Sequence, residues 1–82
     1  MKAFIYNLIA DEYKKATQKH PEWPSDIIHA SAIVAEESGE LTRASLQVTY
    51  EKGKLLAVEE EAVQVIVTAI RFLEGLHAGK YK

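Results

Sequence analysis

The chain has 82 residues, a formal net charge of −2 and no cysteine. This length allows a single domain, residues 1–82, whose core supplies only about 3–5 kcal/mol unless metal binding or oligomerisation adds to it. The absence of cysteine excludes disulfides and sulfur-ligated zinc or iron. The lysines are scattered rather than clustered, so we expect no nucleic-acid partner.

The beginning of the chain does not have the pattern of a secretory signal. Asp11 and Glu12 come too early to leave room for the apolar region of a signal peptide. No apolar run approaches the length needed to cross a membrane. We therefore expect a cytoplasmic protein with no membrane partner.

The first predicted element is an amphipathic helix over about residues 2–18. Its apolar residues recur at i, i+1, i+4 and i+5, which places them on one face of a helix: Phe4, Ile5, Leu8, Ile9, Tyr13 and Ala16. The segment 20–26 contains Pro21 and Pro24 and is predicted to be a loop, because proline lacks a backbone donor and disfavours helical geometry in the residue before it.

A second, long helix is predicted over residues 27–50, with Ser25 or Asp26 as its N-cap. Gly53 is predicted to end the helix in the left-handed conformation. A third helix then follows over about 55–76. Because the connecting turn is short, the second and third helices should be antiparallel neighbours.

The third predicted helix is apolar nearly all round. Between residues 62 and 70 only Gln64 and Thr68 interrupt the apolar residues. Three helices in one small chain cannot cover such a helix, so we expect an all-α, three-helix antiparallel unit that oligomerises into a helical bundle as a dimer or tetramer. The tail from residue 75 to 82 is expected to be frayed.

Acidic residues interrupt these helices at i, i+3 spacing. Glu37 and Glu40 lie on the predicted second helix, on the same side as its apolar residues Ala30 and Ala44. Burial of unpaired carboxylates costs several kcal/mol each, roughly, so a divalent cation is the simplest reason for such a placement. The corresponding spacing on the third helix joins Glu61 to Gln64.

This combination resembles the MazG-like all-α nucleoside triphosphate pyrophosphohydrolases. That family has E-x-x-E on one helix and E-x-x-D on the next, and the match here is Glu37-Ser38-Gly39-Glu40 followed by Glu61-Ala62-Val63-Gln64. The resemblance extends from about residue 23 to 72. It departs from the family at Gln64, which stands where the family has aspartate.

The resemblance implies a reaction in which water attacks the α-phosphorus of a nucleoside triphosphate and pyrophosphate is released. Glu37, Glu40 and Glu61, with Gln64, are the implied ligands of Mg²⁺ or Mn²⁺. Glu36 or Glu60 would then orient or deprotonate the attacking water. These roles are expectations for this chain.

Three further residues are candidates for substrate binding. Trp23 could stack on a nucleobase, and Arg71 or Lys54 could hold phosphate. Each candidate has an ordinary alternative, because loop tryptophans often cover the end of a bundle and basic side chains are commonly surface charges. The same is true of the acids: Glu37 and Glu40 could form a solvated face, and Glu61 could favour a helix N-terminus through the helix dipole.

Gln64 leaves two classes of function open. Its amide oxygen can ligate Mg²⁺ but carries no charge and cannot act as a base. The first class is a metal-dependent pyrophosphohydrolase with a weakened site, in which one metal is bound instead of two or Glu60 or Glu36 supplies the missing charge. The second is a non-catalytic helical interaction or nucleotide-sensing module that has lost a ligand.

Overall fold

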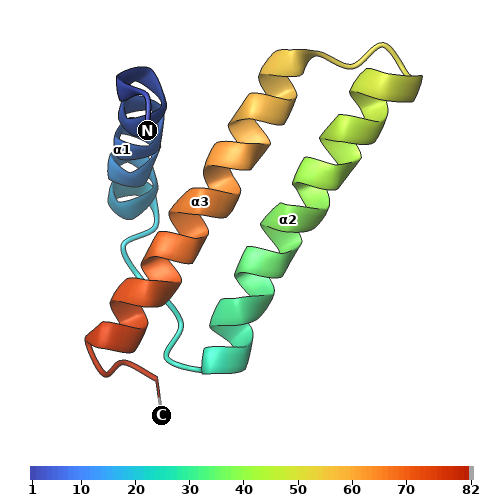
Figure 1. The fold of residues 1–82 in the computed structure, drawn as a ribbon. Helices are drawn as coiled ribbons and strands as arrows, with labels where there is room; N and C mark the ends of the chain where they lie inside the picture. The colour runs from blue at the N-terminus through green and yellow to red at the C-terminus, as the bar shows by residue number, and fades with distance from the viewer. Residues whose placement is uncertain (82) are drawn as a thin grey trace.

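The computed structural model describes residues 1–81, and these form three helices: α1 (Ala3–Lys19), α2 (Ile27–Tyr50) and α3 (Leu55–His77) (Figure 1). No strand occurs among these residues. The predicted all-α, three-helix fold is confirmed, and each helix end lies within one residue of its predicted position. No helix in the described part of the chain combines the length and apolar character needed to cross a membrane.

The helices are arranged as a hairpin with one helix added to its side. Figure 1 shows α2 and α3 running antiparallel, as predicted, with α1 on the other side of α3. The residues of α1 contact α3 and make no helix-to-helix contact with α2. The Tyr13 hydroxyl on α1 donates to the Glu74 carboxylate on α3 at 2.8 Å, and this bond raises the pKa of Tyr13.

The start of α2 is fixed by Asp26 rather than Ser25. The Asp26 Oδ1 atom accepts the backbone N–H groups of Ile28 at 2.8 Å and His29 at 3.0 Å. These are donors that the first turn of a helix cannot satisfy internally. The cap therefore sets where the loop after α1 turns into α2.

The prediction for the α2–α3 turn was wrong about which residue is left-handed. Lys52 adopts the positive φ, +53°, whereas Gly53 does not. Gly53 is needed for space, because a Cβ atom there would lie 2.8 Å from the backbone carbon of Gln47. The Gly53 N–H donates to the Gln47 carbonyl at 2.9 Å, so the turn closes directly over the end of α2.

The core of the single chain is small. Its buried apolar side chains are Ala30 and Ala44 on α2 and Val67 on α3. By contrast, 13 large apolar side chains are more than a third exposed, including Phe4 at 59% and Leu73 at 53%. The chain leaves apolar surface uncovered on α1 and on the α2–α3 hairpin.

One part of this uncovered surface is a groove along the α2–α3 hairpin, here called the α2–α3 groove. Its volume is about 490 Å³, and most of its lining is apolar: Ser31, Val34, Ala35, Ser38, Val65, Ala69, Phe72 and Leu73. The two largest side chains of the lining, Phe72 and Leu73, come from α3. The groove therefore presents a shaped, mostly apolar surface to its surroundings.

The prediction of a frayed C-terminal tail was wrong for the residues that the structure describes. α3 continues to His77, and the ring of Tyr81 folds back on Phe72 with 5.2 Å between ring centroids. The Tyr81 hydroxyl donates to the Phe72 carbonyl at 3.0 Å. Gly75 permits this approach, because a Cβ atom there would lie 2.6 Å from the Tyr81 oxygen. Lys82 lies outside the described residues.

Candidate functional site

The fold brings the acids of α2 and α3 toward one another. Glu37 on α2 is partly buried, and its pKa is raised by the loss of hydration and then by the negative charges of Glu61, Glu40 and Glu36. The largest charge effect comes from Glu61, which belongs to the facing helix. Glu37 and Glu61, two predicted metal ligands from different helices, are therefore close enough for the charge of Glu61 to raise the pKa of Glu37.

The other acids are less enclosed. Glu40 is exposed although it was expected on the apolar side of the helix, and Glu36 and Glu60 are exposed as well. A residue three positions after Glu37 is rotated by about 60° about the helix axis, which is consistent with Glu40 being exposed where Glu37 is partly buried. The acidic cluster therefore has a partly buried centre, Glu37 with Glu61, and an open edge.

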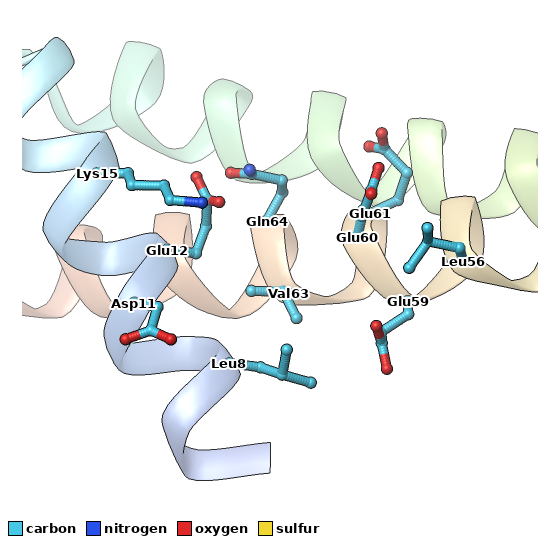
Figure 2. A pocket seen from close by; sticks show the side chains of 10 residues that line it. All are labelled: Leu8, Asp11, Glu12, Lys15, Leu56, Glu59, Glu60, Glu61, Val63 and Gln64. Carbon is cyan, nitrogen blue, oxygen red and sulfur yellow. The ribbon is translucent and has the colours of Figure 1, made fainter. Parts of the chain in front are cut away.

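A pocket of about 370 Å³ opens between α1 and α3 next to this cluster. Its lining combines an apolar floor with charged and amide side chains: Leu8, Asp11, Glu12, Lys15, Leu56, Glu59, Glu60, Glu61, Val63 and Gln64. Figure 2 shows Glu60, Glu61 and Gln64 projecting to one side of α3, where Glu12 and Lys15 reach across from α1, whereas Asp11 and Glu59 point elsewhere. We call this volume the α1–α3 pocket.

The arrangement of the acids limits how a metal could be held. Among residues 1–81, no three histidine, aspartate or glutamate side chains lie close enough together to hold one metal ion. Mg²⁺ often needs only one or two protein carboxylates, because waters and substrate phosphates complete its octahedral shell. Glu37 and Glu61 would be the protein carboxylates in such a mode of binding, with the Gln64 oxygen as a neutral third donor.

The three predicted substrate-binding residues do not line the α1–α3 pocket. Trp23 and Arg71 lie together nearer the C-terminal end of α3, with the Arg71 guanidinium carbon 4.9 Å from the centre of the Trp23 ring. Arg71 Nη2 also donates to the His20 carbonyl at 2.6 Å. Lys54 is the N-cap of α3, at the opposite end of that helix. The phosphate-binding and stacking roles of these residues stay predictions.

Trp23 also contacts the C-terminal tail through its indole nitrogen. The indole Nε1 donates to the Tyr81 hydroxyl at 2.8 Å, and that hydroxyl donates in turn to the Phe72 carbonyl. The loop before α2, the last turns of α3 and the tail are therefore joined through one tyrosine. Trp23 thus contacts both Arg71 and Tyr81, and neither its stacking role nor the ordinary alternative is tested by these contacts.

We expect Tyr81→Phe to loosen this junction without changing the fold. The substitution removes two hydrogen bonds, each worth about 1 kcal/mol net, so the melting temperature should fall by roughly 4–8 °C per kcal/mol lost. The fluorescence of Trp23, the chain's one tryptophan, should shift to longer wavelength as its ring gains water. The matched control is Tyr50→Phe at a 78% exposed tyrosine; equal effects in both variants would show that the junction contributes nothing.

Sequence reasoning missed the contribution of α1 to the pocket. Leu8 was assigned to the apolar face, but its neighbours Glu12 and Lys15, one and two turns further on, carry the polar lining. Their spacing from Leu8, by one and two helical turns, indicated that they share its side of α1. It could not be used, because the sequence does not show which face of α3 receives α1.

Comparisons with known proteins leave the family of the chain open. A scan against protein-family models, a search of curated proteins and a search of solved structures each found no match to this chain.

Proposed function

We propose that this chain is a metal-dependent nucleoside triphosphate pyrophosphohydrolase of the MazG-like type, which releases pyrophosphate and a nucleoside monophosphate. The observation that carries the proposal is the meeting of Glu37 from α2 with Glu61 from α3. Every influence resolved on Glu37 raises its pKa, and three of the four are carboxylates. A cation bound between these groups would remove that repulsion.

The residues suit a site that is completed by its substrate. Glu37 and Glu61 would hold Mg²⁺ or Mn²⁺ together with Gln64, and Glu40 at the open edge would approach as the shell closes. When bound, the metal neutralises phosphate charge and increases the acidity of bound water. Glu36 and Glu60 are exposed beside the cluster, where either can accept a proton from water that attacks the α-phosphorus.

In this proposal Gln64 weakens the binding of metal at the site. It lines the α1–α3 pocket with Glu61, and as a ligand its amide oxygen would add no negative charge. The consequence is low affinity for free metal and tighter binding of metal with triphosphate. Mg²⁺ alone should therefore raise the melting temperature less than Mg²⁺ added with a triphosphate that is not hydrolysed.

The test of the proposed function is pyrophosphate release from a panel of ribo- and deoxynucleoside triphosphates with Mg²⁺ or Mn²⁺. Glu61→Gln should lower turnover at least roughly 100-fold, because a metal supplies several kcal/mol of charge stabilisation and each 1.36 kcal/mol is tenfold in rate. Glu51→Gln, at the far end of α2, is the control and should retain activity. Equal rates for the native chain and Glu61→Gln would exclude this site.

We propose further that the working form is a homo-oligomer in which a second copy covers the α2–α3 groove. A compact 9.2 kDa monomer should expose about 4,900 Å², whereas this chain exposes 6095 Å². The excess, about 1,200 Å², exceeds the roughly 800 Å² that each partner buries in an interface of standard size. The apolar lining of the groove makes it the part of this surface that favours self-association.

The alternative function is a non-catalytic helical interaction or nucleotide-sensing module. It is favoured by Gln64 and by the lack of three clustered ligands in the described part of the chain. The two functions differ in one result. A sensing module would be stabilised by a nucleoside triphosphate with Mg²⁺ yet release no pyrophosphate from any member of the panel.

A further inference from the structure

The proposed substrate carries about four negative charges on its phosphates, so a site built from carboxylates needs cations besides the metal. The basic residues suggested by the sequence are poorly placed for this role in the structure. Arg71 stacks on Trp23 and donates to the His20 carbonyl. Lys54 lies at the N-cap of α3, outside the α1–α3 pocket lining.

Lys15 is the one lysine or arginine in the lining of the α1–α3 pocket, among the residues that the structure describes. It comes from α1, whereas the carboxylates beside it come from α3. Figure 2 shows its side chain extending from α1 in the direction of Gln64 and ending near the Glu12 carboxylate in this view, on the side to which Glu60 and Glu61 project. A flexible lysine in this position can approach an anion without leaving α1.

The charge distribution of the pocket makes Lys15 the one side chain of the lining that could attract an anion. Its polar lining consists of five carboxylates, one amide and this single ammonium. A phosphate chain entering the pocket would be repelled by the carboxylates that hold no metal. Lys15 and a metal held by Glu61 would be the two positive groups that offset this repulsion.

We infer that Lys15 binds the phosphate chain of the substrate, so that α1 forms one wall of the active site. This inference rests on the proposed function and names the residue that provides the positive wall. Lys15 is a substrate-binding residue in this account. Its replacement should weaken binding of triphosphate and leave the chemical step largely unchanged, because it does not hold the water or the α-phosphorus.

The experiment compares Lys15→Gln, Lys15→Arg and Lys14→Gln with the native chain. Lys14 is the adjacent α1 lysine and does not line the pocket. Inorganic tripolyphosphate with Mg²⁺ is titrated by calorimetry, and KM and kcat are measured for the best nucleotide of the panel. Lys15→Gln should raise both the dissociation constant and KM about tenfold, the effect expected for loss of one charged hydrogen bond, with kcat within about twofold.

The outcomes separate the inference from the proposed function. Lys15→Arg should retain most of the affinity, because the charge is kept, and Lys14→Gln should match the native chain. Native affinity and KM in Lys15→Gln would overturn the inference while leaving the hydrolase standing. A kcat loss without a KM change would also overturn it, since that pattern belongs to a group acting in the chemical step. A native chain that neither binds tripolyphosphate nor releases pyrophosphate would overturn the proposed function as well.

Discussion

Glu37→Gln is expected to stabilise the metal-free protein at pH 7 while abolishing pyrophosphate release. The pKa of Glu37 is raised in the folded chain, so folding disfavours its ionised form. Stability linked to this group is fully present below the unfolded pKa of about 4.5 and is lost as pH rises through the folded value. At neutral pH the native chain has lost that stability, whereas glutamine cannot ionise and keeps it.

The measurement is the melting temperature of the native chain and of Glu37→Gln between pH 3.5 and 8, without metal. The advantage of the variant should be largest at neutral pH and should shrink as the pH falls below the folded pKa of Glu37. Glu51→Gln is the control for a general effect of removing negative charge. A variant that melts below the native chain at pH 7 would show that Glu37 already has a favourable partner in the apo protein.

When ligand is added, the effect of Glu37→Gln on the melting temperature, relative to the native chain, is expected to reverse. Mg²⁺ with a triphosphate should raise the melting temperature of the native chain, because it binds only the folded state. Glu37→Gln should show a much smaller shift and at least roughly 100-fold lower turnover. Loss of function together with a gain in stability would mark Glu37 as a residue kept for chemistry rather than for packing.

Leu73→Glu is expected to dissociate the proposed oligomer. Leu73 is 53% exposed in the single chain and lines the α2–α3 groove, so glutamate is tolerated in the monomer but must be buried in the complex. Burial of an unpaired carboxylate costs several kcal/mol, and about 2.7 kcal/mol already weakens association roughly 100-fold. Sedimentation at micromolar concentration should give the mass of one chain for Leu73→Glu and a multiple of it for the native protein.

The control for this experiment is Phe4→Glu. Phe4 is similarly exposed, at 59%, but belongs to α1 and lies outside the α2–α3 groove. It should keep the native mass. A native chain that sediments as a monomer would overturn the oligomer directly, and dissociation by Phe4→Glu alone would move the interface to α1.

The helices could be predicted from the sequence because their signals are local. The spacing of apolar residues, the two prolines and the cap at Asp26 each act within a few residues. The turn was harder. The sequence identified Gly53 but not that Lys52 would take the left-handed conformation, because the close contact of Gly53 with Gln47 depends on how the chain folds back over α2.

The candidate site could be predicted only in part, because it depends on contacts between helices. Helical periodicity predicted that Glu37 and Glu61 would converge from neighbouring helices, and the charge of Glu61 does raise the pKa of Glu37. It could not show that Lys15 would face Gln64 across a pocket, since nothing local fixes where α1 lies on α3. The same limit applies to Tyr81. Its partner Trp23 is distant along the chain, and its partner Phe72 lies on the other side of the turn that follows α3.

The attachment of α1 to α3 alone has a consequence for the working of the pocket. Because α1 makes no helix contact with α2, it can separate from the hairpin without breaking the α2–α3 pair, at a lower free energy than global unfolding. A ligand that contacts Lys15 on one wall and Glu61 on the other would join the two parts. Binding of ligand in the pocket would then favour the state in which α1 is packed on α3, and loss of the ligand would favour its separation.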